Sequence, residues 1–226
     1  MSRFHLCVTD CLKDWQLKGL NHKSSMHNLT ASAAYRCLLP KAWIKSHADS
    51  IWALNKDTKW WKKRLRDIWN CKMPLKQRLF FWRCLVGALP VSHLLAKRHI
   101  SSDICCRCAL KVENIPHLLW DCTFTRRFLL SLKHKLRARF PSFIGGKLFW
   151  IFGIMPKCMT GFVVFSLWLR YWALWTIWQM RNHSMFGQHT FDSFAYFRSS
   201  FRQSLYDCRK MEEIDDHQLE AFFHCF

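Results

Sequence analysis

The sequence contains little glycine, little proline and few acidic residues. Only 7 Gly and 6 Pro occur among 226 residues, which excludes collagen-like chains and low-complexity linkers. Asp and Glu total 15 against 35 Lys and Arg, so the formal net charge is +20. A charge of this size attracts polyanions. Nucleic acid is the first partner class that it favours, and an anionic membrane surface is the second.

The chain also lacks a long uninterrupted apolar segment. The N-terminus has no apolar run with a small-residue cleavage site and does not resemble a signal peptide. The aromatic stretch 162–180 carries Arg170 at its centre and four Trp. A charge is costly inside lipid and Trp prefers membrane interfaces, so we expect no membrane span and no membrane partner. We expect an intracellular protein.

The basic run 59–66 has two readings that the sequence leaves open. It is typical of a nuclear localisation patch, which favours the nucleus over the cytoplasm. It is equally typical of an amphipathic helix with its Trp side chains against the core.

Hydrophobic residues make up 50% of the chain and aromatic residues 16%, which excludes a disordered protein and allows a sizeable core. Alternating strand patterns are scarce, whereas Trp61, Leu65 and Ile68 recur at helical spacing. The sequence therefore predicts a mainly α fold. Helices are expected at 29–39, 50–55, 58–69, 74–89, 92–98, 123–140, 162–185 and 192–211.

Four residues form the pattern C-x2-C-x8-H-x4-C: Cys105, Cys108, His117 and Cys122. Three thiolates and one imidazole are a closed tetrahedral ligand set that favours a structural Zn²⁺. The alternative is that these are incidental cysteines in a chain with 12 Cys. Cys106 is interpreted as a neighbour that binds no metal.

Glu113 lies between the two halves of this pattern. It can accept a hydrogen bond from His117 and so orient that ligand, or it can be a solvated loop residue. The second reading is favoured.

Several short motifs surround the cysteine pattern. They are Ala34-Tyr35-Arg36, Met73-Pro74-Leu75-Lys76, Phe80-Phe81-Trp82-Arg83, Gly87-Ala88-Leu89-Pro90, the run 113–119 before Cys122, and Trp175, Trp178 and Arg181-Asn182. Together they resemble the zinc-binding domain of plant LINE-type (non-LTR) reverse transcriptases, found in retrotransposon polyproteins.

The resemblance implies zinc as the cofactor, bound by the same four ligands. It also implies a division into an N-terminal segment 1–27, a zinc-binding domain 28–140 and an aromatic-rich helical region 141–226. Two features depart from the family: Val91 stands where Thr is usual, and the Tyr-x-Asp-Asp motif of the polymerase is missing. We therefore expect a helical domain with a small embedded Cys3His segment, followed by a helical C-terminal region, without the polymerase domain.

No catalytic pattern stands out. Two-metal phosphoryl chemistry needs clustered carboxylates, and the acidic residues are scattered apart from a polar run at 212–216. Gly-rich phosphate loops and G-x-S-x-G elbows are also missing. We expect no enzyme activity and no small-molecule substrate.

Basic residues near the zinc segment predict a nucleic-acid-binding surface, for RNA or DNA, if they share a face. The alternatives are ordinary solvated helix faces, a protein-interaction or scaffold module that docks through the aromatic helix 162–180, and an inert remnant of a decayed retroelement. The candidate nucleic-acid contacts are Lys62, Lys63, Arg64, Arg66, Lys76, Arg78, Arg83, Arg98, Arg107, Arg126 and Arg127.

Overall fold

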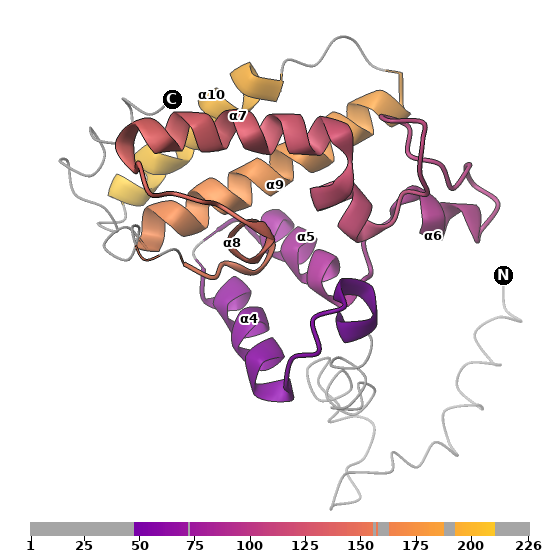
Figure 1. The fold of residues 1–226 in the computed structure, drawn as a ribbon, viewed down its shortest axis with the longest axis horizontal. Coiled ribbons are helices and arrows are strands. Elements are labelled where there is room, and N and C mark those ends of the chain that lie inside the picture. The colour runs from indigo at the N-terminus through magenta and orange to yellow at the C-terminus, as the bar shows by residue number, and fades with distance from the viewer. Residues whose placement is uncertain (1–47, 72, 156, 158–162, 188–192, 211–226) are drawn as a thin grey trace, which may run out of the picture.

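The structure, a computed structural model, describes residues 48–71, 73–155, 157, 163–187 and 193–210. This part of the chain is mainly helical, which confirms the predicted fold class (Figure 1). Its β-structure is limited to an isolated antiparallel bridge between Ile104 and Val112. The helices are α4 (Thr58–Asn70), α5 (Leu75–Val86), α6 (Ser92–Ala96), the π-helical turn η2 (His117–Asp121), α7 (Thr123–Arg139), α8 (Lys147–Phe152), α9 (Val163–Met185) and α10 (Ser193–Lys210).

Helix α9 forms the centre of the fold. It contacts α5, α8, α10 and η2, and Figure 1 shows it crossing the middle of the molecule. Leu169, Ala173 and Ile177 on this helix are fully buried, so the aromatic stretch is the core helix of a packed domain. None of the helices in the described ranges combines the length and the apolar character that a membrane crossing requires.

Most helices begin and end close to the predicted residues. Helix α5 ends earlier than predicted because Gly87 adopts a left-handed conformation with φ of 79° and terminates it. Pro74 is the N-cap of α5 rather than its first helical residue. Helix α8 was not predicted, since its six residues are too few to show a periodic pattern. The predicted helix 29–39 lies outside the described residues.

Two buried arginines cap the C-terminal end of α8. The Arg170 guanidinium, on α9 and 3% exposed, donates from Nε to the Trp150 carbonyl and from Nη2 to the Ile151 carbonyl, both at 2.9 Å. Arg64 on α4 donates from Nη1 to the Phe152 carbonyl at 3.0 Å. The last carbonyls of a helix lack partners within the helix, so α8 depends on these cations from two other helices.

Gly153 follows α8 with φ of +67°. An added Cβ there would lie 2.9 Å from the Arg170 Nη1 atom. Gly153 therefore leaves room for the Arg170 guanidinium at the end of α8. The Cβ of any larger residue at this position would lie too close to the guanidinium.

We expect Arg170→Met to lower the free energy of unfolding by about 2–3 kcal/mol, because it leaves two buried carbonyls without donors. Urea unfolding followed by circular dichroism measures the change. The control is Arg66→Met, which removes an exposed arginine from α4. Equal stability of the two variants would show that the α8 cap contributes nothing.

Candidate metal centre

The first two cysteines lie in a tight hairpin between α6 and η2. The bridge between Ile104 and Val112 closes its base, and the Cys105 N–H donates to the Lys111 carbonyl at 2.9 Å. Inside the turn, the backbone N–H groups of Arg107 and Cys108 donate to Cys105 Sγ. The C-x2-C spacing thus points amide dipoles at a sulfur, as thiolate ligands require.

The other two ligands lie at the two ends of η2. His117 begins this π-helical turn, and the N–H of Cys122 donates to the His117 carbonyl at 2.8 Å, an i to i+5 hydrogen bond. A π-turn brings residues five apart onto one side of the backbone, which explains the H-x4-C spacing. Asn114 Oδ1 accepts from the His117 N–H at 2.8 Å and fixes the start of the turn.

The hairpin and η2 bring all four predicted ligands together. Their ligand atoms lie within 4.8 Å of one another. Cys105 Sγ and Cys122 Sγ are 4.0 Å apart, and Cys108 Sγ and His117 Nε2 are 3.4 Å apart. Zn–S bonds of about 2.3 Å and Zn–N bonds of about 2.0 Å give tetrahedral edges of about 3.8 and 3.5 Å. The residues therefore fit a zinc ion.

Local hydrogen bonds also shift the pKa values of two of the thiols. The hydrogen bond with Cys122 raises the pKa of Cys105 to about 12, with burial as a second cause. The same hydrogen bond, together with the N–H groups of Phe124 and Thr125, lowers the pKa of Cys122 to about 7 despite burial. Cys122 immediately precedes α7, so the positive end of a helix dipole stabilises its thiolate.

Cys106 lies outside the ligand cluster. It is exposed, and its thiol is 3.7 Å from the Arg181 carbonyl. Cys106 is therefore a cysteine of the same hairpin that is not one of the four ligands.

Glu113 holds the hairpin against α9. Its carboxylate is 0% exposed and its Oε1 atom lies 2.8 Å from Nη2 of Arg181, which is 2% exposed. The same oxygen accepts from the N–H and the hydroxyl of Ser92 at 2.8 and 2.9 Å. The prediction that Glu113 is a solvated loop residue is wrong. Among the described residues, its carboxylate contacts Ser92 and Arg181 rather than His117.

The predicted nucleic-acid contacts separate into three groups by exposure. The prediction that Arg64 contacts nucleic acid is wrong. Arg64 is 9% exposed, and its guanidinium binds the Phe152 carbonyl and Asp67 inside the fold. Arg78 and Arg107 are half-buried, and burial lowers the pKa of Arg107. The exposed set is Lys62, Lys63, Arg66, Lys76, Arg83, Arg98, Arg126 and Arg127.

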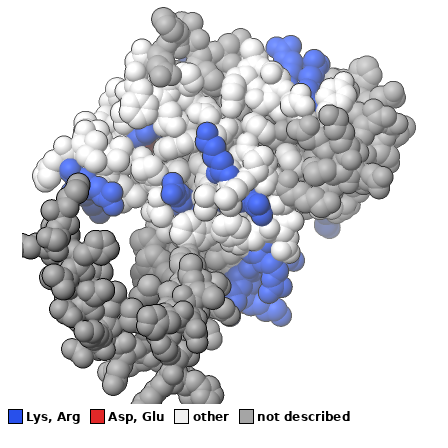
Figure 2. Space-filling view, turned by 180° about the vertical axis from the view of Figure 1, so that it is seen from behind, with Lys and Arg blue, Asp and Glu red and all other residues white. Residues whose placement is uncertain are grey.

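On the face that Figure 2 shows, Lys and Arg do not form one continuous patch. Figure 2 shows separate Lys and Arg side chains scattered over one side of the molecule and a dense group at its lower edge, where α4 lies. Phe124 is flanked by Arg107 and Arg127, with guanidinium carbons 5.0 and 6.0 Å from its ring centroid.

Purified protein is expected to contain one zinc ion per chain, and Cys108→Ser and His117→Ala are expected to lose it, because three ligands hold the ion more weakly than four. Native mass spectrometry measures the stoichiometry. Cys106→Ser is the matched control and should keep the metal. Zinc retained in both ligand variants would contradict the assignment.

Arg181→Met is expected to destabilise the protein by about 3–5 kcal/mol, since it leaves the Glu113 carboxylate buried without its cation. Zinc should also be lost faster to a chelator. The double variant Glu113→Gln/Arg181→Met removes both charges and should recover part of the stability in urea unfolding. A double variant no more stable than Arg181→Met would argue against an ion-pair effect.

Comparison with known proteins adds one match. No curated protein and no solved structure is detectably similar to the chain. Residues 32–128 match the sequence model of a family described as zinc-binding in reverse transcriptase. That range includes all four residues of the metal centre. The match confirms the resemblance over this range: residues 32–128 are similar to the zinc-binding domain of reverse transcriptases.

Proposed function

We propose that the protein is a non-catalytic, zinc-stabilised module that binds nucleic acid and derives from a retrotransposon reverse transcriptase. The family match supports the origin, because it covers the zinc-binding region of such enzymes. The closed Cys3His set supports a structural role for the metal, since four protein ligands leave no position for a reacting water. The zinc would fix the hairpin and η2 against α7 and α9.

The observation that carries the binding proposal is the exposed cationic face of α4. Lys59, Lys62, Lys63 and Arg66 are all exposed and border a surface groove of about 770 Å³.

The two acidic residues on this groove are already engaged. Asp57 accepts from the Trp60 N–H at 2.6 Å as the helix N-cap, and Asp67 lies 3.0 Å from Arg64 Nη2. The four cations outnumber these two carboxylates, and such a surface is suited to a phosphate backbone.

A protein-interaction module is the alternative, with the aromatic helix as its docking face. In the described part of α9, Trp168, Tyr171 and Trp175 are buried against this chain's own helices. The helix therefore has little apolar surface left for a partner, and we favour nucleic acid.

The triple variant Lys62→Ala/Lys63→Ala/Arg66→Ala is expected to weaken binding of a labelled oligonucleotide by about tenfold or more and to reduce the slope of log affinity against log salt by about 2–3. Fluorescence anisotropy across a salt series measures both. The control removes three exposed cations that are not among the candidate contacts, in Lys97→Ala/Lys135→Ala/Arg198→Ala. Binding that is insensitive to salt, or equally weakened in both triples, would contradict a site on α4.

A further inference from the structure

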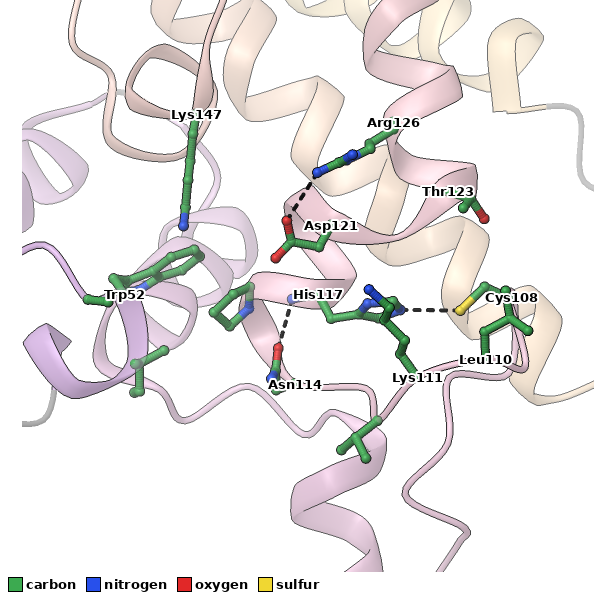
Figure 3. Close-up of a pocket in the computed structure, with 14 residues that line it drawn as sticks. Trp52, Cys108, Leu110, Lys111, Asn114, His117, Asp121, Thr123, Arg126 and Lys147 are labelled. Carbon is green, nitrogen blue, oxygen red and sulfur yellow. Dashed lines mark hydrogen bonds and ion pairs between the residues drawn. The ribbon is translucent and has the colours of Figure 1, made fainter.

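A second cationic hollow lies directly beside the metal centre. It has a volume of about 550 Å³, and its wall includes Cys108 and His117. Figure 3 shows Lys147 and Arg126 reaching toward it from above and Lys111 from the loop below. These cations come from the start of α8, the first turns of α7 and the zinc hairpin, so folding and the hairpin shape bring them together.

The charge of the hollow is positive and largely unopposed. Asp121 is the one carboxylate among its lining residues, and it lies 3.5 Å from Arg126 Nη2. Lys111 is exposed, and Lys147 lies with its Nζ 5.5 Å from the centroid of the buried Trp52 ring. Two lysine ammonium groups are therefore left without a carboxylate in the hollow.

Part of the rim is apolar. Leu110 is 76% exposed and Val112 is 40% exposed, and both line the hollow together with Pro116. Cations beside apolar side chains match the two chemistries of a nucleotide, which has an anionic phosphate and a flat base attached to a sugar. The volume is in the range of pockets that hold molecules of that size.

The hollow is also linked to α4 through residues 48–52, which are helical. Trp52 lines the hollow, and Asp49 Oδ1 accepts from the Nε1–H of Trp61, a buried residue of α4, at 2.8 Å.

We propose that this hollow takes one nucleotide of a single-stranded nucleic acid, with the phosphate between Lys111, Arg126 and Lys147 and the base or sugar against Leu110 and Val112. The inference rests on the nucleic-acid binding proposed above and adds a strand preference to it. A base that is paired and stacked in a duplex cannot enter a concave site of this size, so the hollow distinguishes single strands from duplexes.

The test compares zinc-loaded wild-type protein with Lys111→Ala/Lys147→Ala, using a labelled single-stranded oligonucleotide and a duplex of the same sequence. Single-strand affinity should fall by about tenfold and its salt slope by about 1, while duplex affinity stays within about twofold. The matched control Lys97→Ala/Arg198→Ala removes the same charge from other exposed positions. Unchanged zinc content in both variants verifies the fold.

Three outcomes would overturn the proposal. The first is an equal loss for duplex and single strand, and the second is a single-strand loss no larger than that of the control pair. The third is competition by a free mononucleotide as effective as that by the oligonucleotide, which would indicate a nucleotide pocket instead. If wild-type protein binds neither nucleic acid, the proposed function itself fails, whereas wild-type binding that depends on α4 alone leaves that function intact.

Discussion

The convergence of four side chains on one centre is the constraint on which the zinc hairpin depends. Between Lys97 and Val112, Cys105 is the only buried residue, so this stretch has almost no apolar core of its own. A bound zinc ion can contribute on the order of 10 kcal/mol to the folding of such a segment. Once the hairpin is closed, Glu113 is in position to meet Arg181, and the metal centre becomes part of the same packed unit as α9.

The basic residues of the chain perform two different tasks. Arg64, Arg170 and Arg181 are buried and bind carbonyls or a carboxylate inside the fold. Their charges are therefore unavailable to a polyanion, and the net charge overstates what the surface presents. The charge that remains outside is spread over several helices, and it includes the four exposed cations of α4 and the group around the hollow beside the metal centre.

The buried Glu113–Arg181 pair also bears on how far the folded unit extends. The family match ends at residue 128, yet the partner of a buried residue in the matched range lies on α9. Removing α9 would expose an unpaired carboxylate and one wall of η2. The division of the chain at residue 140 stays a prediction, and contacts cross it in both the apolar core and this ion pair.

The sequence predicted those features that depend on local order along the chain. Helical spacing was sufficient for α4 and α7, and the Cys and His spacing was sufficient to select the four residues that converge. The role of Glu113 could not be predicted, because its partner Arg181 is 68 residues away. Arg64 was misassigned for a similar reason: its position among lysines on α4 gives no sign of the α8 carbonyls that it binds.

The most direct test of the account is X-ray absorption spectroscopy at the zinc edge on the purified protein. The account predicts a four-coordinate ion with three sulfur ligands at about 2.3 Å and one nitrogen at about 2.0 Å. A shell made of oxygen and nitrogen alone, or a protein that folds and carries no zinc, would contradict it.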